Sequence, residues 1–489
     1  MRAKLTALIL LVGTSLVLGG CATTKRYHYQ DIKREYQGLA TQPVAERGGD
    51  QSLPAAGGNQ LKLSGKLSLE RAIELALANN PDQDMAVARI RQSEALVDQA
   101  MAPFYPWLSL YGGYTIGDAP SAYLFKLIDQ RRLAPRVDFN HPGGFENYEV
   151  GIRAQWNLFR GGRDLLRRRM AETGLEISRL GRRSVQNALV ASVTKAFYNC
   201  LASREFIVVA KKSVGTVQKQ LSVMQVRYRA GGVLRSDVLS LEVRLARARE
   251  NLVTARKNHQ LALAALANLL GADPDADFEL EDRPGPAAKV PVTYARGLSV
   301  ALKRRPELLT ARRRVEQARM GLDMVRGEYL PSLNANANYY WDAPHPGDLR
   351  ADYANWTAGL LLNWNLFTGL STRAGESKAR AFLEQMLAAD RKAALQVQLD
   401  VKSAYLNLAE AQARVEVSRA SVARAEESLK LVSRQYQGGS ADITRYLNAE
   451  LALTRARIRA IAARYDREKA LADIARALGL WTEGRKEGK

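Results

Sequence analysis

Cys21 is the residue best placed to undergo a chemical reaction, because it ends an apolar segment that follows a positively charged start. Its thiol could be made into a thioether, and the small residues Gly19 and Gly20 would let a peptidase reach the adjacent peptide bond. The apolar run Leu5–Leu18 is fourteen residues long, which is too short to cross a bilayer. We therefore expect a signal peptide over residues 1–20 and a lipid on Cys21, which would anchor the chain without spanning the membrane.

The residues Leu18-Gly19-Gly20-Cys21 resemble a bacterial lipobox. Ala22 follows the cysteine, and by resemblance to other bacterial lipoproteins this favours sorting to the outer membrane. The alternative is an ordinary secretory signal that happens to contain a cysteine. If Cys21 carries lipid, Cys200 is the only remaining thiol, and a disulfide framework is excluded.

Other chemistry has little support in the sequence. The histidines show no ligand spacing and have no cysteine nearby, so we expect no metal site; they are His28, His141, His259 and His345. There is no phosphate-binding glycine loop and no Gly-x-Ser-x-Gly motif. Carboxylates alternate with Arg and Lys in helical patterns, which is typical of surface ion pairs. We expect no enzymatic activity and no cofactor.

The formal net charge of +22 raises the question of an anionic partner. The basic residues are spread along the expected helices and form no dense block, so we expect no nucleic-acid partner. Contact with anionic lipid head groups, or a bias toward anions in a lumen, remains open beside the simpler interpretation of solvated helix faces.

The chain contains an internal duplication. The motif Trp156-Asn157-Leu158-Phe159 recurs 208 positions later as Trp364-Asn365-Leu366-Phe367, and further matches keep that spacing up to Leu270-Gly271 and Leu478-Gly479. Upstream, Pro81 and Pro106 match Pro306 and Pro331 at a spacing of 225, so the first half has a surplus of seventeen residues between 107 and 155. A duplicated half-molecule explains this pattern better than a solenoid does.

Long proline-free tracts predict unusually long helices in both halves. Apolar or small residues recur at seven-residue steps, and a second seam lies four residues before each of them; the first seam is Val193, Cys200, Ile207, Val214, Leu221 and Tyr228. This spacing is typical of coiled coils. A double glycine interrupts each helix, at Gly231-Gly232 and Gly438-Gly439, so we expect a helical hairpin in each half with its tip at these glycines.

Shorter segments alternate between apolar and polar residues, which predicts strands with two different faces. From Tyr148, one set is Val150, Ile152, Ala154, Trp156 and Leu158, and the interleaved set is Glu149, Gly151, Arg153, Gln155 and Asn157. The period and length suit strands of a membrane β-barrel with aromatic girdles, although a soluble hairpin would show similar alternation. Four strands cannot close a barrel in lipid, so the sequence predicts an oligomer.

In these features the chain resembles the TolC-type outer-membrane efflux family over residues 67–479. The resemblance rests on the Asn80-Pro81 and Pro306 positions, the duplicated Trp-Asn-Leu-Phe motifs with Gly161 and Gly369, and the Tyr228…Gly231 and Tyr436…Gly439 turns. The segments Asp237-Val238-Leu239 and Leu447-Asn448-Ala449 complete it. The N-terminal tail and lipobox are similar to the lipoprotein branch that serves resistance-nodulation-division pumps.

The resemblance implies a mainly α-helical chain whose coiled-coil hairpins form an α-barrel, with four strands per chain in a shared twelve-stranded trimeric β-barrel. It implies a homotrimer in the outer membrane of a Gram-negative bacterium that extends into the periplasm, contacts outer-membrane lipid, and docks to a periplasmic adaptor and an inner-membrane pump. The chain would be the passive channel subunit of a tripartite efflux or export system. Two alternatives stay open: a non-channel periplasmic coiled-coil lipoprotein, and the outer duct of a type I protein secretion system.

The expected domains follow the repeat. They are a signal peptide (1–20), a lipidated tail (21–66), a first repeat (67–271) with strands at 107–116 and 147–159 and a hairpin at 162–271, a linker (272–292), a second repeat (293–479) with strands at 332–341 and 353–367 and a hairpin at 370–479, and a C-terminal tail (480–489).

By position, the resemblance also implies residues that narrow the periplasmic entrance. These are Ser236 and Asp237 in the first hairpin and Arg445 and Asn448 in the second. Members of the family often have acidic residues at the latter two positions, so an acidic ring is not expected here. Asp237 facing Arg445 of a neighbouring hairpin would form an ionic latch; the alternative is a pair of solvated charges that contribute little.

Overall fold

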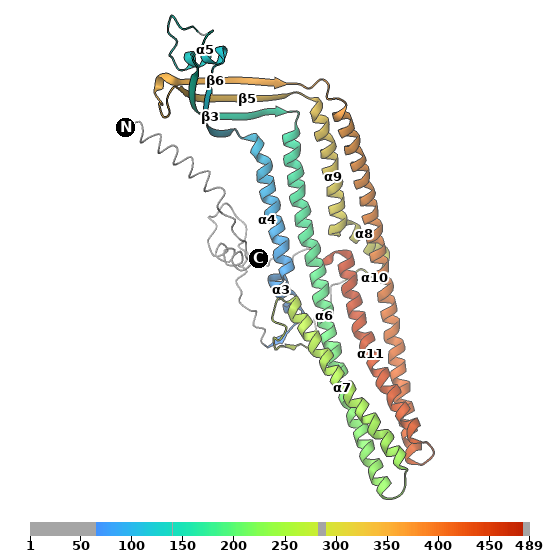
Figure 1. Cartoon of the computed structure of the whole chain (residues 1–489). Helices are drawn as coiled ribbons and strands as arrows, with labels where there is room; N and C mark the ends of the chain where they lie inside the picture. The colour runs from blue at the N-terminus through green and yellow to red at the C-terminus, as the bar shows by residue number, and fades with distance from the viewer. Residues whose placement is uncertain (1–64, 139, 282–289, 483–489) are drawn as a thin grey trace. The chain divides into compact units, whose positions relative to one another are not determined.

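The computed structural model in Figure 1 describes residues 65–138, 140–281 and 290–482. The expected signal peptide, Cys21 and nearly all of the expected tail lie outside these residues. The chain forms two compact units, one containing residues 100–167 and 324–374 and the other containing most of the helical residues. Each unit is described by itself.

The first unit contains a four-stranded antiparallel sheet. Its strands are β2 (Trp107–Gly117), β3 (Phe145–Arg160), β5 (Ser332–Ala343) and β6 (Ala354–Asn363), in the spatial order β2-β3-β5-β6. The two repeats therefore contribute one hairpin each, and β3 and β5 join them at the centre. Strands β2 and β6 are the edges, and neither has a second partner in the sheet.

The sheet has one polar and one apolar face, as the alternation predicts. The register places Ser109 opposite Arg153, Arg153 opposite Asn338, and Asn338 opposite Thr357, so one polar row crosses all four strands. The other face presents large apolar side chains to the exterior, among them Leu110, Ile152, Trp356 and Leu360.

The fourth strand is shorter than the expected 353–367, because it ends at Asn363. Asn363 pairs with Ser332, the first residue of β5, so residues beyond Asn363 have no neighbouring strand to bond. Trp364 instead donates its indole N–H to the Tyr329 carbonyl at 3.0 Å.

The expected loop between the first two strands contains a helix that the sequence reading missed. Helix α5 (Pro120–Asp129) begins with a proline at its first position, where a missing N–H costs nothing. The matching connection between β5 and β6 has only one turn of 3₁₀-helix, η3 (Ala351–Tyr353). The seventeen-residue surplus therefore corresponds to a folded element and not to a longer irregular loop.

The second unit is helical. Its elements include α3 (Leu69–Asn79), α4 (Pro81–Met101), α6 (Arg163–Arg229), α7 (Arg235–Leu269), α8 (Tyr294–Arg304), α9 (Pro306–Arg326), α10 (Ser371–Gln437) and α11 (Ile443–Leu478), with several helices beginning or ending in the first unit. Both α6 and α10 have 67 residues, which gives a length of about 100 Å at 1.5 Å per residue. None of the described helices has an apolar stretch long enough to cross a membrane.

Each repeat begins with two helices where the sequence reading expected one. The break falls at Asn80-Pro81 and at Arg305-Pro306, where Asn80 and Arg305 have extended backbone angles. A following proline disfavours the helical conformation, so the first helix ends there and a second begins at the proline.

Three short elements lie where a linker or tail was expected. Strands β1 (Lys66–Leu67) and β4 (Glu279–Leu280) form a small parallel pair, so the expected linker at 272–292 contributes to the fold. A turn of 3₁₀-helix, η4 (Leu480–Thr482), follows α11 in the expected C-terminal tail.

Two apolar cores in the second unit repeat one another. Leu189, Val193 and Leu266 in the first correspond to Val397, Val401 and Ile474 in the second, each 208 residues later. Cys200 lies in the first core and is fully buried. Burial raises the pKa of its thiol to about 12, so this cysteine acts as a packing residue and not as a nucleophile.

Candidate functional site

The first hairpin turn joins α6 to α7. Gly231 has a φ of +76°, a left-handed conformation that glycine adopts without steric cost. Its N–H donates to the Tyr228 carbonyl at 2.9 Å, and the N–H of Gly232 donates to the Arg227 carbonyl at 2.9 Å. These bonds satisfy two of the last carbonyls of the long helix as the chain reverses direction. The Tyr228 side chain is exposed.

The second turn, between α10 and α11, repeats this geometry. Gly439 has a φ of +79°, its N–H donates to the Tyr436 carbonyl at 3.3 Å, and the N–H of Ser440 donates to the Gln435 carbonyl at 2.8 Å. Each of these residues lies 208 positions after its counterpart in the first turn, so the duplicated motif specifies one backbone conformation twice.

The two turns differ in how the returning helix starts. Asp442 caps α11, because its carboxylate accepts the Arg445 N–H at 2.7 Å. The equivalent residue before α7 is Leu234, which is exposed and has no side-chain oxygen to act as a cap. The first tip therefore lacks a stabilising bond that the second tip has.

An apolar cluster near the turns joins the two hairpins. Its buried members are Val217, Leu221, Met224, Val238, Leu241, Leu245, Val432, Ile443 and Tyr446. Tyr436 borders it, with its ring centroid 5.7 Å from that of Tyr446 and its hydroxyl 3.5 Å from the Met224 sulfur. The repeated tyrosines thus have different surroundings: Tyr436 packs between the hairpins and Tyr228 does not.

Charge surrounds the Tyr436 ring. The Arg227 guanidinium carbon lies 5.9 Å from the ring centroid, within cation–π range. Burial raises the pKa of the Tyr436 hydroxyl, Arg227 lowers it, and the Asp237 carboxylate adds to the rise.

The expected entrance residues are found on the first turn of α7 and the first two turns of α11. Ser236, Arg445 and Asn448 are exposed, and Asp237 is half-buried. Among the described residues, Asp237 and Arg445 form no ion pair with each other. Asp237 and Arg445 are instead repeat equivalents, since they lie 208 positions apart, so within one chain they occupy matching places on different hairpins.

Farther from the turns, a buried carboxylate links the hairpins. Glu450 on α11 is 4% exposed. It receives the Arg244 guanidinium at 3.1 Å and the hydroxyls of Ser213 and Thr454 at 2.8 Å and 3.0 Å. The charge is thus both paired and hydrogen-bonded, as a buried carboxylate requires. Its repeat equivalent, Glu242, is exposed.

Polar contacts continue between α6 and α11 beyond Glu450. The Tyr465 hydroxyl donates to Glu205 at 2.6 Å, Lys469 donates to Asn199 at 3.0 Å, and Lys195 lies 3.0 Å from Asp473. Arg464 also pairs with Glu205. Residue numbers rise along α11 as they fall along α6, so the two helices are antiparallel neighbours, and the contacts fix their register.

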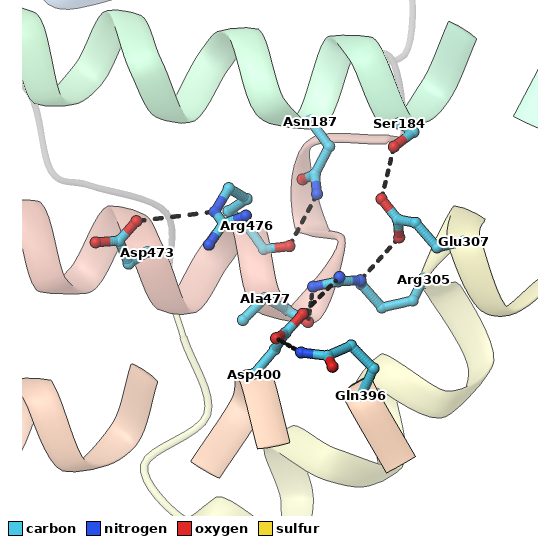
Figure 2. Close-up of polar contacts among 9 residues, drawn as sticks. All are labelled: Ser184, Asn187, Arg305, Glu307, Gln396, Asp400, Asp473, Arg476 and Ala477. Atoms are coloured by element: carbon cyan, nitrogen blue, oxygen red, sulfur yellow. Dashed lines mark hydrogen bonds and ion pairs between the residues drawn. The ribbon is translucent and has the colours of Figure 1, made fainter. Parts of the chain in front are cut away.

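Figure 2 shows where the neighbouring helices α6 and α11 meet the start of α9. Arg305 is 6% exposed, and its guanidinium donates to Glu307 at 2.9 Å, to Asp400 at 3.0 Å and to the Ala477 carbonyl at 3.2 Å. Ser184 donates to Glu307 at 2.6 Å. One side chain therefore connects α9, α10 and the end of α11, and Glu307 extends the network to α6.

Two further hydrogen bonds in Figure 2 belong to the same network. Asn187 donates to the Arg476 carbonyl at 2.8 Å, and Gln396 donates to Asp400 at 2.8 Å. Burial opposes ionisation of Glu307, but the Ser184 hydroxyl and the Arg305 charge outweigh it and lower the pKa of the carboxyl.

The contacts described above hold long helices together. Within residues 65–138, 140–281 and 290–482, no cluster of three or more His, Cys, Asp or Glu side chains could hold a metal ion. The sequence predicts the two turns but does not single out Glu450, Tyr446 or Arg305, because a single buried ionisable residue has no distinguishing sequence pattern.

Comparison with known proteins supports a transport role. The sequence profile of the family described as "Outer membrane efflux protein" matches residues 72–272 and 297–480. The chain is 26% identical over 420 residues to the pyoverdine export outer membrane protein OpmQ of Pseudomonas aeruginosa, covering 86% of each chain. It is 28% identical over 456 residues to protein CyaE of Bordetella pertussis, covering 92% of this chain and 89% of that protein.

The fold matches solved outer-membrane channels. The channel OprN aligns with a TM-score of 0.73 at 20% identity, over 89% of this chain and all of that chain. VceC of Vibrio cholerae aligns with a TM-score of 0.71 at 19% identity, over 84% of this chain and 96% of that one. These similarities are too distant in sequence to transfer a substrate, and they establish the architecture alone.

Proposed function

The chain belongs to the outer membrane efflux protein family, and on that basis we propose that it is the passive outer duct of a tripartite efflux or export system. The coarser statement is already established: its homologues are outer-membrane components of efflux and export systems, and its structural neighbours are outer-membrane channels. The more specific proposal is that this chain forms a passive duct without catalytic groups. It rests on the sheet and the helices described above.

The sheet with two different faces carries the proposal. A polar row of Ser109, Arg153, Asn338 and Thr357 crosses all four strands, and the opposite face is apolar. In a membrane barrel, the apolar face meets lipid and the polar face lines water. Family membership and this sheet together argue against the alternative of a coiled-coil lipoprotein without a channel.

The open edges of the sheet support a homotrimer. Strands β2 and β6 each have one bonded neighbour, and unpaired backbone groups are not tolerated in lipid. Copies of the chain can satisfy both edges by pairing β6 of one with β2 of the next. Two copies would give a barrel of eight strands with a filled interior, whereas three would give twelve strands and a lumen.

Exposed apolar residues on α7 and α10 support the same assembly for the helices. Leu239, Val243, Val253 and Leu261 on α7 are exposed, as are Leu395, Leu399, Leu406, Val417 and Leu431 on α10. Within the chain, α6 and α11 contact each other, while these rows on α7 and α10 stay exposed. Docking α10 of one copy against α7 of the next would bury these rows and close a helical tube.

We further propose that Cys21 anchors the chain by lipid, and that the hairpin tips form the periplasmic entrance. The lipobox supports the first claim, and the tight turns at Gly231 and Gly439 support the second. Ser236, Asp237, Arg445 and Asn448 lie just past these turns. A periplasmic adaptor and an inner-membrane pump would complete the pathway, with the adaptor docking near the tips.

Protein secretion is the second candidate function. The chain is 26% identical over 326 residues to the alkaline protease secretion protein AprF of Pseudomonas aeruginosa, covering 65% of each chain. The pyoverdine export relative matches over a longer stretch, and together with the lipobox this favours efflux of small molecules.

Single-channel conductance of the detergent-extracted protein, with the chain count checked by native mass, tests the proposed function. A trimer with discrete conductance steps is the expected result. A protein that leaves membranes without detergent and never conducts would overturn it. Asp237→Arg tests the entrance, because reversing a charge at the narrowest point should change conductance; an unchanged value would show that this residue does not line the entrance.

A further inference from the structure

Helix α5 lies over the polar face of the sheet, near the Gly117 end of β2 and the Phe145 end of β3. Lys126 donates to Asp342 at 2.9 Å, Gln130 donates to Asn147 at 3.0 Å, and Arg131 donates to Asn355 at 3.1 Å. Asn147, Asp342 and Asn355 all belong to the polar face. The register and the alternation of side chains along each strand place them on the same side of the sheet as Arg153 and Asn338. The helix and the two residues that follow it thus contact β3, β5 and β6 on a single face.

The contact between α5 and the sheet is built around a buried ion pair. The Asp342 side chain is fully buried, and its Oδ1 accepts from Lys126 and from Asn147, the latter at 2.6 Å. Its Oδ2 is buried and has no hydrogen-bond partner among the described residues. Lys126 is therefore the cation that offsets this carboxylate, with Glu149 a further 3.5 Å neighbour of its ammonium group. Removing Lys126 would leave a buried charge without compensation, which is strongly unfavourable.

The end of α5 is also held in an unusual conformation. Arg131 has a φ of +55°, in the left-handed region that residues other than glycine rarely adopt. Its contact with Asn355, and the bond of 3.4 Å from the Asn355 amide to the Asp129 carbonyl, fix the helix end against β6. The helix is fastened at its middle and at its end, so it is part of the folded sheet unit and not a free loop.

We infer that α5 narrows the outer mouth of the channel and limits the size of solutes that can enter from outside. This inference rests on the proposed duct, in which the polar face lines the lumen. Twelve strands about 4.8 Å apart and tilted by about 40° enclose a diameter of roughly 24 Å between backbones. Three helices, each about 10 Å across, fit within a circle of roughly 22 Å. Three copies of α5 side by side would therefore fill about half of the cross-section of the mouth.

The asymmetry of the duplication supports a role in selectivity. The second repeat connects its strands over the ten residues 344–353, so the sheet can be closed without a helix. The first repeat places its surplus on the polar face, which faces the pore. The exposed side chains on α5 include Phe125, at 62%, and Ile128, at 39%, so the narrowed mouth would present apolar groups to a polar solute.

Cysteine accessibility in intact cells tests the inference without depending on the periplasmic entrance. Gln155→Cys, in a Cys200→Ser background, places a thiol on the exposed polar face below α5. A small charged thiosulfonate and a maleimide carrying a bulky polyethylene glycol are applied from outside. Ala337→Cys, on the apolar face of the same sheet, serves as the orientation control.

Two variants remove or loosen α5 in different ways. The first replaces residues 118–144 with the sequence of 344–353 and so removes α5 while both strands remain. The second, Lys126→Met, removes the buried counter-charge and leaves the loop length unchanged. Arg136→Met is the matched control, because Arg136 is an exposed cation in the same loop.

We expect both variants to raise the rate at which the bulky reagent labels Gln155→Cys about tenfold or more. The labelling rate of the small reagent should not change, and neither rate should change in the Arg136→Met control. Equal bulky-reagent rates with and without α5 would overturn the inference while leaving the duct intact. A different result would overturn the proposed function itself. If the small reagent labels Ala337→Cys but never labels Gln155→Cys, in any of the loop variants, then the polar face does not line the lumen.

Discussion

Gly161 and Gly327 pass so close to each other that neither position has room for a side chain. A Cβ on Gly161 would lie 2.1 Å from the Gly327 carbonyl oxygen, and a Cβ on Gly327 would lie 2.5 Å from the Gly161 oxygen. The contact joins the end of β3 to the turn that precedes β5, where the two repeats meet at the base of the sheet. Gly369 is the repeat equivalent of Gly161. It has a similar φ of +61°, but an added Cβ there would have no atom within 4 Å.

Gly161→Ala should therefore be much more damaging than Gly369→Ala. Both substitutions place a Cβ at positive φ, which costs about 1–2 kcal/mol. Gly161→Ala adds a clash with backbone that cannot move aside, for a total of about 3 kcal/mol or more. Thermal unfolding of the detergent-solubilised assemblies measures the difference. Equal melting temperatures for the two variants would contradict the close approach.

Arg305→Asn should loosen the network of Figure 2. Asn80 occupies the equivalent place in the first repeat, where its amide donates to the Leu269 carbonyl at 3.0 Å. That bond matches the one from Arg305 to the Ala477 carbonyl. Asparagine should keep this bond but leave Glu307 and Asp400 without their cation, at a cost of about 1–3 kcal/mol because both carboxylates keep some solvent contact.

The triple variant Arg305→Asn, Glu307→Gln and Asp400→Asn provides the control. It removes the stranded charges together with the cation, so it should recover much of the stability lost in Arg305→Asn alone. Chemical denaturation of the parent, the single variant and the triple variant measures their free energies of unfolding. A triple variant no more stable than Arg305→Asn would show that the unpaired charges do not cause the loss of stability.

The same network predicts a pH dependence. The folded protein holds the pKa of Glu307 below its ordinary value of 4.5, so ionisation of this group stabilises the fold above that pH. The contribution should disappear as the pH falls through the lowered pKa. Unfolding of the parent and of Glu307→Gln, compared from neutral to acidic pH, should give a difference in stability that shrinks below about pH 4.5. A difference independent of pH would exclude this carboxylate as its source.

Leu234→Asp should stabilise the first hairpin tip. The substitution copies Asp442 of the second tip, whose carboxylate caps α11, and an N-cap of this kind contributes about 1 kcal/mol. Hydrogen exchange at the first amides of α7 should slow about fivefold. Asp442→Leu is the reciprocal change and should speed exchange at the start of α11, so a lack of effect at both tips would rule out a capping difference.

The two hairpin turns and the two faces of the sheet were the predictable features of this fold. Glycine at Gly231 and Gly439 is required by the left-handed turn, and the alternation from Tyr148 onward reflects the two faces of β3, so residue type alone indicates these features. The helix α5 was not predicted, because a segment of ten residues is too short to show a clear helical period. Its position also depends on Lys126 reaching Asp342, 216 residues away. The partners of Glu450 and Arg305 depend on helix register in the same way, and register between helices is set by packing over the whole unit.

The unpaired edges of β2 and β6 have a genetic consequence. If three copies share one barrel, each copy supplies both a β2 edge and a β6 edge, and a single copy with a damaged edge breaks the ring. Co-production of equal amounts of intact chain and an edge-damaged chain that still joins the assembly would leave about one ring in eight free of damaged copies. Such an edge mutation should therefore act dominantly in the cell, whereas a mutation that only prevents folding should be recessive.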